Sequence, residues 1–154
     1  MPNHEHPSIE LRRARSTDSP SITAESSYAL DSTWARASFE RLLNDDGRGA
    51  VWLAHRESEA AGYVVLTLKH SMEFGGVDAF IDDLFVRPHF RRQRVASALL
   101  SALFEHCGKI QAAAVHVELG PNNSAARALY SGFGLSNQGR EVLTAHINRE
   151  VHAV

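Results

Sequence analysis

The sequence predicts a single-domain α/β fold in which a mixed, mostly antiparallel sheet surrounds a central helix. The clearest observation is an amphipathic stripe from Val95 to His106, with apolar residues at the i, i+3, i+4, i+7 and i+8 spacing of one helix face. A strand-like apolar run, Val77–Val86, leads directly into it. Two more such runs come earlier at hairpin spacing, and another follows only after the helix. Early hairpins and late crossovers are typical of mixed α/β sheets.

Composition limits the class of protein. The chain has 154 residues, 44% of them hydrophobic and 22% charged, which fits one ordinary globular domain. We expect a flexible tail at 1–8 and a single domain at 9–154. The formal charge of −2 excludes a global attraction to nucleic acid. The single cysteine, Cys107, excludes an internal disulfide. With no signal peptide or long apolar run, we expect a soluble, cytoplasmic protein without a membrane partner or metal.

The first half of the chain alternates short strands and helices. Ile9–Ala14 alternates in polarity and predicts a strand. Asp18 or Ser19, followed by Pro20, is typical of a helix start and predicts a first helix over Ser21–Leu30. A further helix is expected around Thr33–Leu43. Two strands, Ala50–His55 and Gly62–Lys69, should then pair.

The second half repeats the strand and helix pattern. The connection Met72–Gly76 leads into the strand Val77–Val86, and the central helix should end at a left-handed Gly108. Ala113–Leu119 predicts a strand with His116 and Glu118 on one face. Asn123 then caps a short helix, Ser124–Ser131, that ends at Gly132. Leu143–Asn148 predicts the last strand.

The turn before the central helix is rich in arginine. Arg87, Arg91, Arg92 and Arg94 crowd a helix N-terminus, whose unpaired N–H groups already carry partial positive charge. Cations at this end disfavour an isolated helix, but they suit the binding of a phosphate. The alternative is a solvated basic turn that binds nothing.

Two motifs resemble those of the GNAT (Gcn5-related) N-acetyltransferases. Arg91–Ala96 is similar to the family's Gln/Arg-x-x-Gly-x-Gly/Ala turn, with Arg94 where the family has glycine. Asn123–Leu135 resembles Asn-x-x-Ala-x-x-Leu-Tyr-x-x-x-Gly-Phe, with Leu135 in place of phenylalanine. The resemblance covers roughly Ile9 to Ile147. It implies a sheet that splays between the strands before and after the central helix.

The resemblance implies acetyl-CoA as co-substrate. Its binding residues would be Leu84, Phe85, Val86, Arg91, Arg92, Gln93, Arg94, Val95, Ala96, Ser97, Asn123 and Tyr130, with an oxyanion-binding backbone N–H near Leu84–Phe85. The effect of Arg94 is open. If it strains the turn, Arg94→Gly should tighten cofactor binding, whereas if it clamps phosphate the same change should weaken it.

The resemblance also implies catalytic roles. Tyr130 would protonate the departing thiolate. Asp82 would be the base or the anchor of the acceptor amine, because acid-Asp-Leu/Phe-Phe-Val resembles the small-amine and diamine branch of the family. Strand alternation sends Asp82 and Asp83 to opposite faces. An exposed carboxylate paired with an arginine is the equal alternative. Asp83, Trp34 and Glu73 are further acceptor-site candidates, and Glu73 and His116 are less favoured proton relays.

The expected function is therefore direct acetyl transfer from acetyl-CoA to a primary amine of a small molecule, such as a polyamine, a diamine or an amino-acid-like compound. A protein or peptide amine is the alternative acceptor, and a catalytically silent acyl-CoA-binding module is the alternative function. Many members of the family are dimers, so we expect a homodimer.

Overall fold

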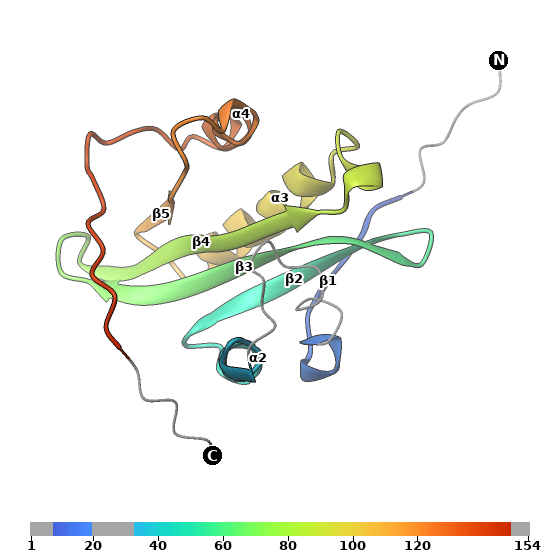
Figure 1. The fold of residues 1–154 in the computed structure, drawn as a ribbon, viewed down its shortest axis with the longest axis horizontal. Helices are drawn as coiled ribbons and strands as arrows, with labels where there is room; N and C mark the ends of the chain where they lie inside the picture. The colour runs from blue at the N-terminus through green and yellow to red at the C-terminus, as the bar shows by residue number, and fades with distance from the viewer. Residues whose placement is uncertain (1–7, 20–32, 149–154) are drawn as a thin grey trace. The chain divides into compact units, whose positions relative to one another are not determined.

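The computed structural model describes residues 8–19 and 33–148 of the chain, with side chains from residue 36 in the second range (Figure 1). The predicted N-terminal tail, apart from Ser8, and the predicted helix Ser21–Leu30 lie outside these residues. The chain forms two compact units, residues 1–118 and 119–154, which are described separately. Within the described ranges, no helix is both long enough and apolar enough to cross a membrane.

A five-stranded sheet forms the centre of the first unit. Its order follows the chain: β1 (Glu10–Arg13), β2 (Gly49–Arg56), β3 (Glu59–Ser71), β4 (Gly76–Val86) and β5 (Ala114–Val117). The first four strands are antiparallel to their neighbours, and β5 pairs in parallel with β4. A parallel neighbour requires a crossover, which α3 (Val95–Lys109) provides. The predicted mixed, mostly antiparallel α/β fold is confirmed.

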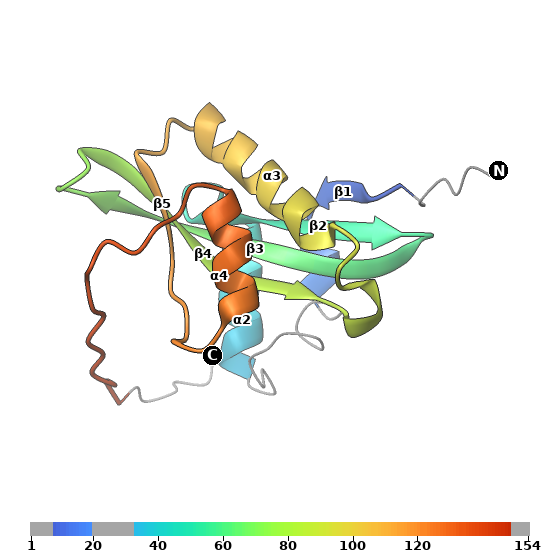
Figure 2. The same ribbon diagram turned by 90° about the horizontal axis from the view of Figure 1, so that it is seen from above.

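Helices cover both faces of the sheet (Figures 1 and 2). The stripe of α3 buries Leu99, Leu100 and Leu103. On the other face, α2 (Thr33–Leu43) brings Phe39, Leu42 and Leu43 against the core residues Val51, Leu53, Tyr63 and Val65. Because both faces are covered, β2 and β3 read as nearly continuous apolar runs instead of alternating in polarity.

Two glycines allow the backbone to pack closely in this sheet. A Cβ at Gly49, where β2 begins with φ +154°, would lie 1.9 Å from the carbonyl oxygen of Leu66. A Cβ at Gly62 in β3 would lie 2.4 Å from the carbonyl oxygen of Phe85. Neither separation is possible between real atoms. Both positions therefore require glycine for the strands to keep their present spacing.

A β-bulge interrupts β4 at Asp82. Val65 of β3 lies opposite Asp83, but the next residue, Leu66, lies opposite Ile81. Asp82 is thus an extra residue without its own counterpart. The expectation that Asp82 and Asp83 alternate between the two faces is wrong, because the bulge breaks the alternation between them.

The sheet opens beside the C-terminal half of β4. Pairing with β5 starts at Asp78 and ends with Ile81 opposite Val117, so the rest of β4 pairs only with β3. The predicted splay is confirmed. The Arg87 N–H donates to the Ala61 carbonyl 2.9 Å away, which places Arg87 on the β3 side. Backbone groups of a strand alternate between its two edges, so those of Val86 and Leu84 face the opening.

Asp18 ends the 3-10 turn η1 (Ser16–Asp18), its carboxylate accepts from the Arg15 N–H at 2.8 Å, and the next residue, Ser19, is helical, which agrees with the predicted helix start at Asp18 or Ser19. The predicted end of the central helix is wrong. The helix α3 passes through Gly108 to Lys109, and the left-handed residue is Gln111, with φ +55°. The Ala112 N–H donates to the Cys107 carbonyl, which completes a Schellman closure around that glutamine.

The second unit contains the predicted short helix, α4 (Ser124–Gly132). The Asn123 side chain caps it by accepting from the Ala126 N–H at 3.1 Å, as predicted. A Schellman closure ends it, with Gly134 left-handed and the Leu135 N–H donating to the Tyr130 carbonyl. The predicted strand Leu143–Asn148 is wrong. This segment has no regular structure, and its Leu143 and Ile147 side chains are exposed, because an apolar alternation makes a strand only where a backbone partner is available.

Candidate active site

The start of α3 presents unpaired backbone N–H groups. The first hydrogen bond of the helix runs from the Ala98 N–H to the Arg94 carbonyl, at 3.0 Å. The N–H groups of Val95, Ala96 and Ser97 therefore have no acceptor within the helix. No acidic residue lies in the first turn to neutralise the positive end of the helix dipole. This end of the helix is suited to bind a phosphate.

Two arginines of the preceding turn are held by the protein, and two are available to a ligand. Arg87 pairs with Glu59 at 2.8 Å. The Arg91 Nε donates to the Val86 carbonyl at 3.0 Å, which fixes the turn against the end of β4. Arg92 and Arg94 are exposed and make no hydrogen bond or ion pair with any residue that the structure describes. Two uncompensated guanidinium groups beside open N–H donors fit a diphosphate.

Gln93 holds the turn in place instead of pointing a side chain at a ligand. Its side-chain amide donates to the His89 carbonyl at 2.8 Å and accepts from the Arg56 guanidinium. His89 is the middle residue of the short 3-10 turn η2 (Pro88–Phe90). Arg56 is only 5% exposed although it is charged. Sequence reasoning missed Arg56. The signal that could have indicated it is a charged residue at the end of an otherwise apolar strand.

The backbone of the turn is left-handed at two arginines, Arg92 with φ +60° and Arg94 with φ +64°. Arg94 occupies the position where the resembling motif has glycine. The left-handed conformation costs a residue with a Cβ about 1–2 kcal/mol relative to the right-handed one. The strain of this conformation acts on folding stability, whereas contact of the guanidinium with a phosphate would act on binding, so the two effects can be measured separately.

This separation resolves the two expectations for Arg94→Gly. We expect the variant to melt at a higher temperature because the strain is relieved. We also expect coenzyme A to bind about 2- to 5-fold more weakly, the value of one exposed ion pair. Calorimetric titration and a thermal melt measure the two effects.

Arg94→Lys is the control for Arg94→Gly, since it keeps the charge and the Cβ. Tighter binding of coenzyme A by Arg94→Gly would contradict the separation of strain from binding.

The open edge of β4 distinguishes between the predicted oxyanion donors. Leu84 and Val86 direct their N–H groups toward the opening, whereas Phe85 directs its own toward β3. The Phe85 ring packs against Tyr63 instead, with ring centroids 5.8 Å apart. Of the two expected N–H groups, only that of Leu84 lies on the open edge.

Acidic side chains gather where β4 and β5 separate. Burial raises the pKa of Asp82, and the charges of Asp83 and Glu118 raise it further. The Asp82 side chain still reaches solvent, so these effects are partly screened. The Tyr63 hydroxyl donates to the Asp83 carboxylate at 2.5 Å. We call Asp82, Asp83 and Glu118 the acidic cluster. Such a group suits an ammonium ion.

Sequence reasoning missed Glu118 in the acidic cluster, and it missed Tyr63, which donates to the cluster's Asp83. Glu118 was placed only on a strand face, and its proximity to Asp82 depends on the pairing of β5 with β4. Within the described ranges, no group of three or more histidine, cysteine or acidic side chains is arranged to hold a metal ion.

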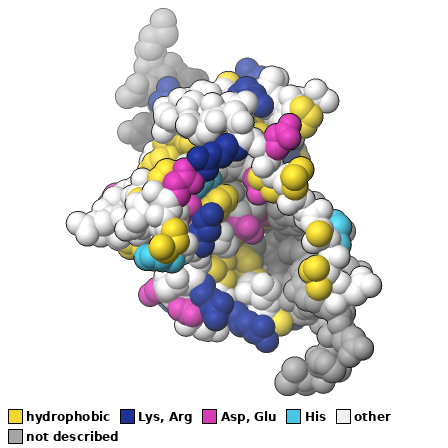
Figure 3. Space-filling view, turned by 90° about the vertical axis from the view of Figure 1, so that its left-hand side faces the viewer, with side chains coloured by type: hydrophobic (Ala, Val, Ile, Leu, Met, Phe, Trp, Pro, Cys, Tyr) yellow, Lys and Arg dark blue, Asp and Glu magenta, His cyan; other side chains and the backbone are white. Residues whose placement is uncertain are grey.

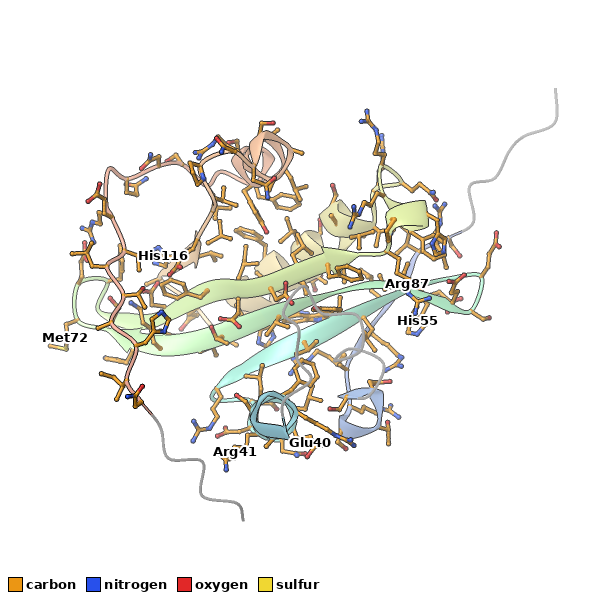
Figure 4. All side chains as sticks on the ribbon, in the orientation of Figure 1. Glu40, Arg41, His55, Met72, Arg87 and His116 are labelled. Carbon is orange, nitrogen blue, oxygen red and sulfur yellow. The ribbon has the colours of Figure 1, made fainter. Side chains whose placement is uncertain are left out.

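The other predicted site residues come from other elements of the chain. Glu73 is in the hairpin between β3 and β4, at the far end of β4 from the basic turn. Trp34 is in α2, but its side chain is not among those described. Asn123 and Tyr130 belong to the second unit. Figure 4 shows His116 toward the hairpin end that carries Met72, with Arg87 at the opposite end of the sheet.

Figure 3 shows the face at the left of Figure 1, where acidic and basic side chains are interleaved without a large field of one sign. A shallow depression also lies on α2 and the loop after it, and it includes none of the predicted site residues. Its lining is Ala37, Glu40, Arg41, Asn44, Asp45 and Arg48.

A splayed sheet with a phosphate-binding helix start beside the opening is the arrangement that the sequence motifs imply. The profile of the acetyltransferase (GNAT) family matches residues 11–135. The chain belongs to this family. It is therefore an acetyl-CoA-dependent N-acetyltransferase, with acetyl-CoA as co-substrate. The open N–H groups, with Arg92 and Arg94, fit the diphosphate of that molecule.

Individual relatives differ in what they acetylate. A Bacillus subtilis (strain 168) protein, described as a candidate ribosomal protein bS18-alanine N-acetyltransferase, is 22% identical over 84% of this chain and 82% of its own. An integron cassette protein from the mobile metagenome of Cole Harbour Salt Marsh is 30% identical, with a TM-score of 0.78 and 93% of each chain covered. The aminoglycoside N-acetyltransferase AAC(6')-Iy, solved with CoA, has a TM-score of 0.78 at 17% identity, covering 93% of this chain and 97% of its own. Similarity at that identity establishes the fold alone.

Proposed function

We propose that this acetyltransferase moves the acetyl group of acetyl-CoA directly onto a primary amine of a small molecule that carries more than one amine. Polyamines, diamines and aminoglycosides are compounds of this class. The observation that supports the proposal is the acidic cluster at the sheet opening, where the charges of Asp83 and Glu118 act on Asp82. Three carboxylates exceed what one ammonium group needs, and they suit an acceptor with several positive charges.

The residue roles follow the order of the reaction. The helix-start N–H groups of Val95–Ser97, with Arg92 and Arg94, bind the diphosphate. Leu84 and Val86 offer backbone groups to the pantetheine arm and to the oxyanion. Asp82 anchors the acceptor ammonium, assisted by Asp83. Tyr130 protonates the thiolate that leaves, and Asn123 contacts the cofactor beyond its capping role.

A panel of acceptors tests the proposal. Initial rates of coenzyme A release are measured with a thiol reagent on mono-, di- and polyamines, aminoglycosides, amino acids and an alanine-terminated peptide. We expect kcat/KM to rise with the number of positive charges on the acceptor. We also expect that advantage to shrink as salt is added, because exposed charges are screened.

The alternative acceptor is a protein amine, which the description of the Bacillus subtilis relative favours. Under that alternative the alanine-terminated peptide is the best substrate, and diamines do no better than monoamines. Binding of acetyl-CoA without turnover on any amine would instead indicate a silent module. The expected homodimer stays a prediction, which sedimentation of the purified protein tests.

Asp82→Asn tests two effects of the Asp82 charge, one on the binding of the acceptor and one on the stability of the fold. We expect kcat/KM for a diamine to fall about 10- to 100-fold, the value of one hydrogen bond to a charged group. At neutral pH the same variant should melt at a higher temperature, because the fold raises the pKa of Asp82 and so disfavours its charged form. This stability gain should appear as the pH rises through that raised pKa, and it should vanish below about pH 4, the usual aspartate value.

Glu105→Gln is the matched control for Asp82→Asn, since it neutralises an exposed carboxylate on α3 that pairs with Lys109. An Asp82→Asn variant with unchanged kcat/KM would remove Asp82 from the acceptor site.

A further inference from the structure

Asp78 is a carboxylate buried within the sheet. It lies in β4 and is 1% exposed, the least of any acidic residue that the structure describes. His116 of β5 contacts one of its oxygens, with Nε2 2.6 Å from Oδ1. The Lys69 ammonium of β3 lies 3.5 Å from the other oxygen. A buried charge requires such partners. The His116 side chain is 31% exposed, so it can also exchange protons with a substrate or with solvent.

The imidazole of His116 is held in one orientation. Its ring stacks on Phe80 at a centroid distance of 4.8 Å and tilts against Phe74 at 5.5 Å. Because Nε2 faces the carboxylate, a proton on that nitrogen is held there and Nδ1 is left as the basic nitrogen. Within the described residues, the ring makes no other hydrogen bond.

His116 also lies near the opening of the sheet. It pairs with Phe80, and the next pair, Ile81 with Val117, is the last before the strands separate. Lys69, Asp78 and Phe80 share the sheet face of Val65 and Asp83, given the register of β3 and β4. Glu118 of the acidic cluster follows His116 by two residues, about 7 Å along an extended chain.

We propose that His116 accepts the proton of the acceptor amine and that Asp78 is its positioning residue. This deepens the proposed function and rests on it. An amine enters the acidic cluster as an ammonium ion and cannot attack until it loses a proton. His116 Nδ1 takes that proton, directly or through one water molecule, and the buried Asp78 carboxylate stabilises the imidazolium.

The remaining steps balance the reaction. The neutral amine forms the C–N bond to the acetyl carbon, and the C–S bond breaks. The departing thiolate receives a proton from Tyr130, and the phenolate recovers one from the second N–H of the attacking nitrogen. His116 then releases its own proton to solvent through its exposed edge. The products are the amide, coenzyme A and one proton.

Other charged groups lie on the elements next to this histidine. Lys69 approaches the Asp78 carboxylate from β3 and weakens its effect on the ring. Glu118 follows on the continuation of β5, and the hairpin that carries Phe74 also carries Glu73. The pH dependence of kcat/KM is therefore compared among variants at one fixed ionic strength, so that these neighbours contribute equally to each pH profile.

His116→Gln is the decisive variant, since its amide can still donate to Asp78 from the position of Nε2 but cannot accept a proton at Nδ1. We expect kcat with the best amine to fall about 10²- to 10⁴-fold, the usual range for general base catalysis, with a much smaller change in KM. In His116→Gln, the fall of kcat/KM at low pH should disappear from the pH profile. Asp78→Asn should lower kcat with little change in KM, because the ring loses its fixed orientation, and added imidazole should restore part of the rate of His116→Ala.

His70→Gln on β3 is the matched control, because His70 is exposed and precedes the hairpin. A melting curve of each variant separates unfolding from loss of catalysis. The inference is overturned if His116→Gln keeps both the rate of the wild-type enzyme and its fall of kcat/KM at low pH. If instead the wild-type enzyme acetylates no amine in the panel, the proposed function fails and this inference fails with it.

Discussion

Replacing Gly49 by alanine is expected to destabilise the first unit by about 3 kcal/mol or more, the sum of a left-handed backbone cost and of overpacking. The added Cβ would lie 1.9 Å from the Leu66 carbonyl oxygen and 3.0 Å from the Leu42 side chain. Neither backbone can move freely, since Ala50 pairs with Leu66 and the Leu68 N–H donates to the Arg48 carbonyl at 2.8 Å. Urea denaturation followed by tryptophan fluorescence measures the loss.

Two other glycines serve as controls for Gly49→Ala. Gly76→Ala adds a methyl group to open space at the start of β4, and we expect little change in stability. Gly75→Ala also meets open space, but its φ of +70° isolates the cost of the left-handed conformation from that of the clash. If Gly49→Ala lost no more stability than Gly75→Ala, steric contact with Leu66 would not be the reason for glycine at this position.

Tyr130→Phe is expected to lower kcat by about 10²- to 10⁴-fold, because it removes the proposed proton donor of the thiolate. The dissociation constant of coenzyme A should hardly change, since the diphosphate and the pantetheine arm are held by other groups. Steady-state kinetics with a saturating diamine and calorimetric titration with coenzyme A separate the two quantities. The loss should shrink with an acyl donor whose thiol is more acidic, because such a thiolate leaves without a proton.

Tyr63→Phe is the control for Tyr130→Phe, because it also removes one tyrosine hydroxyl. That hydroxyl donates to Asp83 in the acidic cluster, so we expect the KM of the amine to rise while kcat changes less. An unchanged kcat in Tyr130→Phe would exclude Tyr130 as the acid.

The local features of the site could be predicted from the sequence. The stripe that begins at Val95 and the crowding of Arg91, Arg92 and Arg94 before it are properties of neighbouring residues, and the structure has both. Asn123 could be assigned as a cap for the same reason. The positive φ of Arg94 was an open alternative, because only the backbone reveals whether a turn without glycine keeps the left-handed conformation.

The features that were missed depend on contacts between strands or on competing local signals. The bulge at Asp82 is a property of β3 and β4 together, so alternation along one strand could not reveal it. Glu118 joins the acidic cluster through the pairing of β5 with β4. The left-handed residue after α3 is Gln111, a position where glycine is usual, so the expectation that the helix ends at Gly108 was wrong. Leu143–Asn148 has the polarity of a strand without forming one.

The bulge divides β4 into two segments whose hydrogen-bond registers are set separately. Residues 76–81 are aligned by the hairpin and by β5, and residues 83–86 are aligned by β3 alone. A mutant library confined to the hairpin and to residues 77–81 can therefore reshape the part of the site near His116 without shifting the Leu84 and Val86 amides. Acceptor preference in this enzyme should evolve independently of its affinity for the acyl donor.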